Sequence, residues 1–102
     1  MYAKFVQNRI TELRLAKNVS ERGMSLDLGH STGYIHSIAS GRALPSMSEF
    51  FYICEYLGVT PNEFFDDGNK NPVLYQTLIN ELSELAPEQI ENLRSIIRGL
   101  KK

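Results

Sequence analysis

Residues 20–42 (SERGMSLDLGHSTGYIHSIASGR) constrain the fold most, because their pattern is that of two short helices joined by a tight turn. Ser20 is the expected N-cap of the first of these helices, and Met24 and Leu28 are its inward residues. Gly29 follows directly and provides the positive φ that a sharp turn requires. The spacing therefore predicts a helix that stops abruptly and lets the chain change direction.

The second short helix of this stretch is expected from Thr32 to about Ala39, with Ser31 as its N-cap and Gly41 as its stop. Ile35 and Ile38 lie on the same side at helical spacing, so they are expected to face the core. Two helices joined in this way present the second helix outward. The other helices are then expected to hold that helix at a fixed angle.

Helix signals also surround this stretch on both sides. A helix is expected from Lys4 to Lys17, ended by a left-handed Asn18, and its inward face carries Phe5, Val6, Ile10 and Leu13, with Lys17 at the edge. Ser46 and Glu49 form an expected capping box, followed by a helix that carries Phe50, Phe51, Ile53, Cys54 and Leu57 and ends at Gly58. Thr60 and Glu63 form a second capping box with Pro61 at the first helical position, and that short helix ends after Phe64 and Phe65.

A polar linker, residues 66–72, separates this region from two amphipathic helices. The first is expected from Pro72 to Leu85 with Leu74, Leu78, Leu82 and Leu85 on one stripe, and the second begins at Pro87 with Ile90, Leu93, Ile97 and Leu100. Two isolated helices cannot bury both stripes alone. They either fold back on the first region or pair with a second chain, and we favour pairing through Leu78, Leu82, Leu85, Ile90, Leu93 and Ile97.

The composition excludes several classes of protein. A chain of 102 residues with 42% hydrophobic residues has room for one core plus a small appendage. The sequence lacks an apolar run long enough to span a bilayer, and the first ten residues lack the apolar stretch of a secretory signal. Cys54 is the single cysteine, so an internal disulfide is excluded, and it is expected to be a small core residue. These features predict a cytoplasmic protein without a membrane partner.

The charges are segregated along the chain although the net charge is only −1. Residues 1–42 contain six basic and three acidic side chains, whereas residues 43–67 contain five acidic side chains and no basic one. A basic region beside an acidic one is compatible with a nucleic-acid partner on one side of the molecule. A mixed, solvated surface is the alternative interpretation of the same charges.

From Arg9 to Phe65 the sequence resembles the Cro/C1-type (XRE) helix-turn-helix regulators of bacteria and phages. The matching pieces, in order, are Leu13-Arg14, Lys17, Val19-Ser20, Leu28-Gly29, Ser31, Tyr34-Ile35, Ile38, Gly41-Arg42, Pro45-Ser46, Leu57 to Pro61 and Glu63 to Phe65. The resemblance implies an all-α fold, with a five-helix lambda-repressor-like DNA-binding domain over residues 1–67. Residues 68–102 would form a helical, dimerising segment.

The resemblance also implies which residues meet DNA. The helix-turn-helix motif would span about residues 20–40, and its second helix, from Thr32 to about Ala39, would enter the major groove of double-stranded DNA. Base contacts are then expected from Thr32, Gly33, His36 and Ser37. Phosphate contacts are expected from Ser20, Glu21, Arg22, Ser31, Tyr34, Ser40 and Arg42.

The chain departs from the family pattern at several positions. Glu21 stands where the family usually has a glutamine, and a carboxylate there repels the DNA backbone. Ala39 stands where a glutamate often pairs with the arginine of the first helix, so Arg14 must find another acceptor or reach solvent. Gly23 and Ser25 occupy positions in a helix where better helix formers are common.

Two functions fit these observations. The first is a sequence-specific transcriptional regulator, a repressor in our interpretation, that binds a pseudo-palindromic operator as a homodimer. The second is a protein-interaction module that retains the fold and binds DNA weakly or not at all. An enzyme is not indicated, because His30 and His36 form no convergent arrangement with Asp27, Ser31 or Cys54. No metal, cofactor or small-molecule ligand is expected.

Overall fold

A computed structural model describes residues 2–66, 68 and 70–101 of the chain. These residues form an all-α fold, as predicted, and no strand occurs among them. The chain divides into two compact units, Met1–Pro72 and Val73–Lys102. Residues 67 and 69 of the predicted linker lie outside the described residues. None of the helices in the described part combines the length and the hydropathy that crossing a membrane demands.

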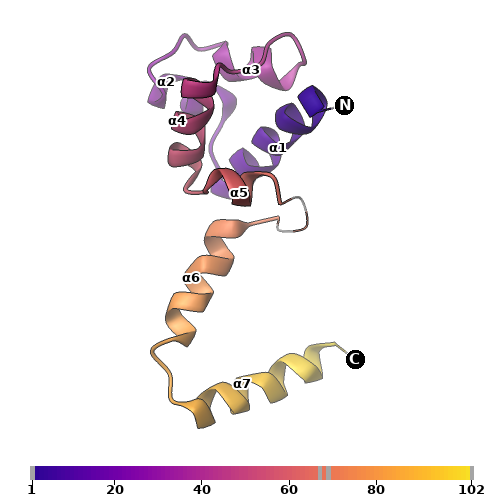
Figure 1. Ribbon diagram of the computed structural model, residues 1–102, viewed down its shortest axis with the longest axis vertical. Coiled ribbons are helices and arrows are strands. Elements are labelled where there is room, and N and C mark those ends of the chain that lie inside the picture. The colour runs from indigo at the N-terminus through magenta and orange to yellow at the C-terminus, as the bar shows by residue number, and fades with distance from the viewer. Residues whose placement is uncertain (1, 67, 69, 102) are drawn as a thin grey trace. The chain divides into compact units, whose positions relative to one another are not determined.

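Seven helices follow one another in the described ranges (Figure 1). The first unit contains α1 (Tyr2–Lys17), α2 (Glu21–Asp27), α3 (Tyr34–Ala39), α4 (Met47–Leu57) and α5 (Pro61–Phe64). α6 (Pro72–Leu82) begins at the last residue of the first unit and continues into the second. α7 (Pro87–Leu100) lies within the second unit. The predicted helix from Pro72 to Leu85 is therefore three residues shorter, and residues 83–86 connect it to α7.

One hydrophobic core holds the first unit together. It consists of buried residues from every one of α1–α5 and the loop after α4: Ile10, Leu13, Met24, Ile35, Ile38, Phe50, Ile53, Cys54, Leu57, Val59 and Phe64. Phe51 of α4 does not belong to this core, because its side chain is 48% exposed. Successive helical residues point about 100° apart, so Phe51 turns outward when Phe50 and Cys54 face the core.

Left-handed residues end the helices at the places predicted. Asn18 follows α1 with a φ of 63°, and Gly58 caps α4 with a φ of 75°. Gly29 in the turn after α2 has a φ of 80°, a conformation that residues with a Cβ atom rarely adopt. These local signals place the helices of the first unit in the order expected from the sequence.

Of the two predicted capping boxes, one is complete. At α5 the Thr60 hydroxyl accepts the Glu63 amide at 3.1 Å, and the Glu63 carboxylate accepts the Thr60 amide at 2.8 Å. At α4 the Ser46 hydroxyl accepts the Glu49 amide at 3.2 Å, but the Glu49 carboxylate contacts Nε2 of His30 at 2.8 Å. A contact with the His30 ring, in the turn after α2, thus replaces the reciprocal half of the second box.

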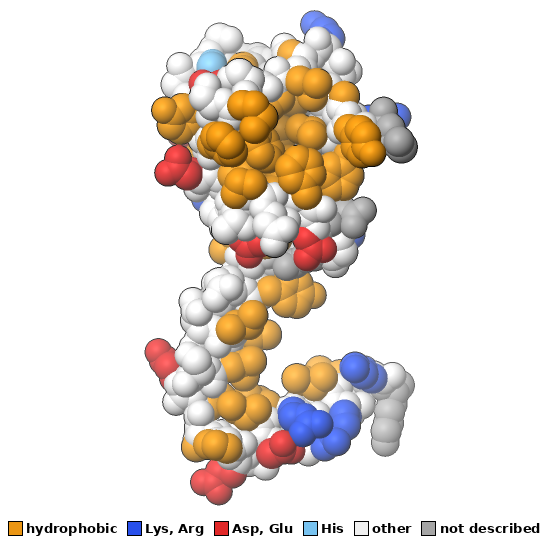
Figure 2. All heavy atoms as spheres, viewed as in Figure 1, with side chains coloured by type: hydrophobic (Ala, Val, Ile, Leu, Met, Phe, Trp, Pro, Cys, Tyr) orange, Lys and Arg blue, Asp and Glu red, His pale blue; other side chains and the backbone are white. Residues whose placement is uncertain are grey.

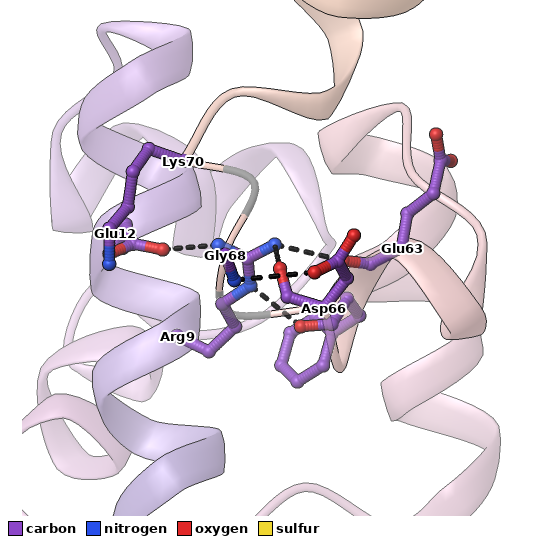
Figure 3. Close-up of polar contacts among 7 residues, drawn as sticks. Arg9, Glu12, Glu63, Asp66, Gly68 and Lys70 are labelled. Carbon is purple, nitrogen blue, oxygen red and sulfur yellow. Dashed lines mark hydrogen bonds and ion pairs between the residues drawn. The ribbon is translucent and has the colours of Figure 1, made fainter.

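Arg9 ties α1 to the end of α5 (Figure 3). Its side chain is buried, and its guanidinium donates to the carbonyls of Phe64 at 2.6 Å and of Glu63 and Asp66 at 2.8 Å each. It also forms an ion pair with Glu12, whose other carboxylate oxygen lies 3.1 Å from Nζ of Lys70. The free carbonyls at a helix end require donors, and here one buried arginine supplies several of them.

Large apolar side chains of the second unit remain exposed. Leu78 is 50% exposed, Ile97 is 53% exposed, and Leu82, Leu85, Ile90 and Leu93 are half-buried. Leu78, Leu82, Leu85 and Leu93 line an open hollow of about 390 Å³ between α6 and α7. This pair of helices therefore covers its apolar stripes only in part.

Candidate nucleic-acid interface

The turn between α2 and α3 is built from backbone hydrogen bonds around Gly29. Ser20 caps α2, since its hydroxyl accepts the Gly23 amide at 2.9 Å. The amide of Gly29 donates to the Leu26 carbonyl and the amide of His30 donates to the Ser25 carbonyl, each at 3.0 Å. The Ser20 contact begins α2 and the Gly29 and His30 contacts end it, as the Ser20 and Gly29 signals predict.

Ser25 joins α2 to α3 through its side chain. It is fully buried, and its Oγ accepts the Ile35 amide at 3.0 Å while donating to the Glu21 carbonyl at 2.7 Å. The sequence suggested only a weak helix former at this position, but the hydroxyl supplies the partner that the first turn of α3 needs. The one signal available was its place beside Met24 on the inward face of α2.

The predicted start of α3 is wrong by two residues. The helix begins at Tyr34, and Gly33 is its N-cap without a side-chain hydrogen bond. Ser31 was the expected cap, but it contributes its backbone carbonyl, which accepts the Tyr34 amide at 3.1 Å. A hydroxyl cap from Ser31 is unnecessary because Ser25 already takes the Ile35 amide. Thr32 and Gly33 therefore lie in the turn that leads into α3.

The expected base-contacting residues lie around the exposed side of this turn and helix. Thr32, Gly33 and His36 are exposed, and Ser37 is half-buried. On the opposite side of α3, Ile35 and Ile38 are fully buried. The helix thus offers a short, nearly uncharged outer surface while its inner surface is fixed in the core.

His36 has a carboxylate partner from α2. Its Nδ1 atom lies 3.1 Å from Oε1 of Glu21, across the gap between α2 and α3. The His36 side chain is 59% exposed and that of Glu21 is 33% exposed. One residue expected at a phosphate and one expected at a base are therefore in contact with each other.

The other expected phosphate contacts lie on both sides of α3. Arg22, Ser31, Ser40 and Arg42 are exposed, while Ser20 is exposed but uses its hydroxyl as the cap of α2. The Ser40 hydroxyl donates to the Ser37 carbonyl at 3.2 Å. Arg22, near the start of the motif, and Arg42, just after α3, thus provide exposed basic side chains.

The loop after α3 is held in place by hydrogen bonds from its own backbone and from α1. The amides of Arg42 and Ala43 donate to the Ser37 carbonyl at 3.0 and 3.1 Å, and Gly41 has a φ of 88°. From α1, the buried side chain of Gln7 donates to the Ala43 carbonyl at 3.1 Å. Arg42 is therefore anchored by its backbone although its side chain is exposed.

Tyr34 differs from the other expected phosphate contacts. Its ring stacks on His30 with centroids 3.7 Å apart, and its hydroxyl is buried without a hydrogen-bond partner among the described residues. Burial, with the nearby Glu49 carboxylate, raises the pKa of Tyr34 above its ordinary value. In this conformation the hydroxyl donates to no group on the outer surface.

Arg14 obtains a new acceptor in place of the glutamate often found at the Ala39 position. Its Nη1 donates to the Val19 carbonyl at 2.8 Å, just beyond the end of α1. Its Nε is buried and has no partner within the part of the chain that the structure describes. The Val19 carbonyl thus takes the place of the glutamate that Arg14 lacks at position 39.

Comparison with known protein families supports this architecture. A family model described as a helix-turn-helix matches residues 10–64, which is more than half of the 102 residues. The match runs from the middle of α1 to the end of α5 and so contains the whole core of the first unit. No curated protein and no solved structure gave a match.

Proposed function

Because the chain belongs to the Cro/C1-type (XRE) helix-turn-helix family of DNA-binding regulators, we propose that it represses transcription by binding a specific operator in double-stranded DNA. The observation that carries this proposal is that one side of α3 is buried in the core and the other is exposed. Its inner residues Ile35 and Ile38 are fully buried, and its outer surface is exposed and polar. A single helix held in this way fits the width of the major groove.

Base readout is assigned to Thr32, Gly33, His36 and Ser37. Thr32 offers a hydroxyl and a methyl group, and the methyl group suits the methyl of thymine. Gly33 has no side chain and permits a close approach of the backbone to the bases. Because these residues are few, discrimination rests on a small number of contacts.

Phosphate contacts are assigned to residues in and around α3: Ser20, Glu21, Arg22, Ser31, Tyr34, Ser40 and Arg42. Glu21 takes part through its backbone amide, because its carboxylate repels phosphate, and Tyr34 takes part only if its buried hydroxyl turns outward. Arg42 supports this assignment best, since its backbone is fixed by Ser37 while its side chain is exposed. Neutralising phosphates releases counterions, so binding must weaken as salt rises.

We propose that the second unit makes the protein a homodimer. Leu78 and Ile97 are about half exposed, and a hollow of about 390 Å³ lined by Leu82 and Leu93 is open to solvent. A second copy of the same two helices offers the matching apolar stripe, as a two-fold interface requires. Two copies would then read the two halves of a pseudo-palindromic operator.

The DNA proposal is tested by selecting bound duplexes from a random library and measuring affinity by fluorescence anisotropy across salt. We expect Arg42→Ala to weaken binding to all sequences and to reduce the salt slope by about one. Thr32→Ala should instead relax the preference at one base position. The exposed Arg98→Ala on α7 is the control and should change neither quantity. Unchanged binding in both site variants would exclude these assignments.

The dimer is tested by size-exclusion chromatography with light scattering on the full chain. Wild type should elute with the mass of two chains, and Ile97→Glu should elute as one chain because it puts a charge into the apolar stripe. Ser95→Glu, on the same helix, should remain dimeric. A monomeric wild type would overturn this proposal and leave the DNA assignments to the binding assay.

A specific observation favours a second candidate, the protein-interaction module. Apolar side chains gather on one face of the first unit (Figure 2), and a groove of about 200 Å³ there is lined by Val6, Leu44, Pro45, Met47, Phe50 and Phe65. Leu44 and Met47 are 53% and 67% exposed, and contiguous exposed apolar patches mark sites of protein contact. Failure to select any DNA sequence, with a defined protein bound in a way that Met47→Glu abolishes, would favour this function.

A further inference from the structure

The contact between Glu21 and His36 determines where the imidazole carries its proton. Oε1 of Glu21 lies 3.1 Å from Nδ1 of His36, and an ionised carboxylate can only accept a hydrogen bond. Nδ1 must therefore be the donor in this contact. In a neutral ring with its proton on Nδ1, the other nitrogen, Nε2, has a lone pair and can only accept.

We propose that Glu21 is a positioning residue that sets the base preference of His36. The inference rests on the proposed function, in which His36 meets a base edge in the major groove. An accepting Nε2 pairs with the exocyclic amino group of adenine or cytosine. It has no donor for O6 and N7 of guanine or for O4 of thymine, because these atoms also only accept.

Positioning of His36 explains why an acidic residue, Glu21, lies on the surface proposed to face DNA. His36 is 59% exposed and sits on the outer side of α3, whose inner side is fixed by Ile35 and Ile38. Glu21 belongs to α2, and the buried Ser25 of the same helix bonds to the first turn of α3. The carboxylate and the imidazole are thus held on two elements that are tied together. Ring orientation and tautomer are set before DNA arrives.

Two variants and one control separate the parts of this proposal. At pH 8, the full chain and its Glu21→Gln, His36→Ala and Glu55→Gln variants each select duplexes from a random library. Wild type and the exposed α4 control Glu55→Gln should enrich adenine or cytosine at one position of the half-site by roughly fivefold or more. His36→Ala should lose that preference. Glu21→Gln should accept all four bases there to within about twofold, because an amide can donate or accept.

A spectrum of the free protein provides a readout that a purely structural role would not change. Long-range ¹⁵N–¹H correlation distinguishes a proton on Nδ1 from one on Nε2. Wild type should show His36 protonated on Nδ1, and Glu21→Gln should show a mixture of both forms. The same mixture in wild type would overturn the positioning role.

The outcomes also distinguish this proposal from the proposed function. A chain that selects no sequence overturns the function and the base readout together. Selection in which Glu21→Gln keeps the wild-type preference overturns only the role of Glu21. Selection in which His36→Ala keeps it removes His36 from the readout and the proposal with it.

Discussion

The Oγ atom of Ser25 accepts the backbone amide of Ile35 at 3.0 Å, and this contact joins α2 to the first turn of α3 inside the core. The same hydroxyl donates to the Glu21 carbonyl at 2.7 Å, so both of its hydrogen-bonding roles are filled. α3 is short, and its cap Gly33 has no side chain to offer. The angle at which α3 leaves the turn therefore depends on one buried serine.

Ser25→Ala should lower the free energy of unfolding by about 1–3 kcal/mol, because the buried Ile35 amide loses its acceptor. Urea unfolding followed by circular dichroism measures the change. Ser95→Ala, at an exposed position on α7, is the matched control and should stay within about 0.5 kcal/mol of wild type. Equal stability of the two variants would show that the Ser25 hydroxyl is not needed to hold α3.

Arg9→Met should be the most destabilising substitution considered, at about 3 kcal/mol or more. It leaves the Phe64 carbonyl and its neighbours at the end of α5 without the guanidinium, and Glu12 without its buried partner. Arg22→Met, at an exposed position on α2, should change stability by less than about 0.5 kcal/mol. Chemical denaturation of both variants measures the difference, and a small effect at Arg9 would contradict the assigned contacts.

Tyr34→Phe should keep or raise stability, by up to about 1 kcal/mol, because it removes a buried hydroxyl that lacks a partner in the described structure. The ring that stacks on His30 is retained. The melting temperature reports the change in stability. If DNA affinity falls in the same variant, the hydroxyl moves outward on binding and contacts phosphate after all.

Stability should decrease as the pH falls through the range in which Glu12 takes up its proton. Burial alone would raise the pKa of Glu12, but hydrogen bonds from Lys70 and Arg9 outweigh burial and lower it below 4.5. A lowered folded-state pKa stabilises the fold above the unfolded value, and this contribution is lost as pH falls through the folded value. The carboxylate is about one-third exposed, so we expect an effect below about 1 kcal/mol.

Unfolding free energies measured from pH 6 to pH 3 check this dependence. Glu12→Gln should have a flatter profile than wild type, since it has no proton to take up at this position. Lys70→Met should flatten the profile in part, because it removes one of the two hydrogen-bond donors. A Glu12→Gln profile parallel to that of wild type would rule out this source of acid sensitivity.

Cys54 should be unreactive in the folded protein. Burial raises the pKa of its thiol to about 11, so only about one thousandth is thiolate at pH 8. An aromatic disulfide reagent should therefore modify it slowly in buffer and rapidly in concentrated urea. Rapid modification in buffer would show that α4 opens without global unfolding.

The helix order and stops of the first unit could be predicted because they depend on local chemistry. Asn18, Gly29 and Gly58 lie in positive-φ conformations that few other residues tolerate. Thr60 and Glu63 are only three residues apart and complete each other's hydrogen bonds. Such signals act within one turn of the chain, so a single sequence contains them in full.

The missed features depend on residues that are distant in sequence. Arg9 bonds to a carbonyl 55 residues away, although its place between Val6 and Leu13 on the inward face of α1 was a signal that it is buried. Ser25 bonds to Ile35 and Glu21 to His36 across a turn that sequence alone does not orient. Helical periodicity gave the exposed face of α3 but not the contacts that its side chains make.

The contacts of Arg9 also determine when the first unit can complete its fold during synthesis. α1 leaves the ribosome before α5, and the Asp66 carbonyl to which Arg9 donates is made 57 residues after Arg9. At about 5–20 residues per second, this delay is roughly 3–11 s. A nascent chain that ends before Glu63 lacks all three carbonyls, those of Glu63, Phe64 and Asp66, to which the guanidinium donates. The first unit therefore completes its fold only when nearly all of it has been translated, and chains that stop earlier are exposed to proteolysis.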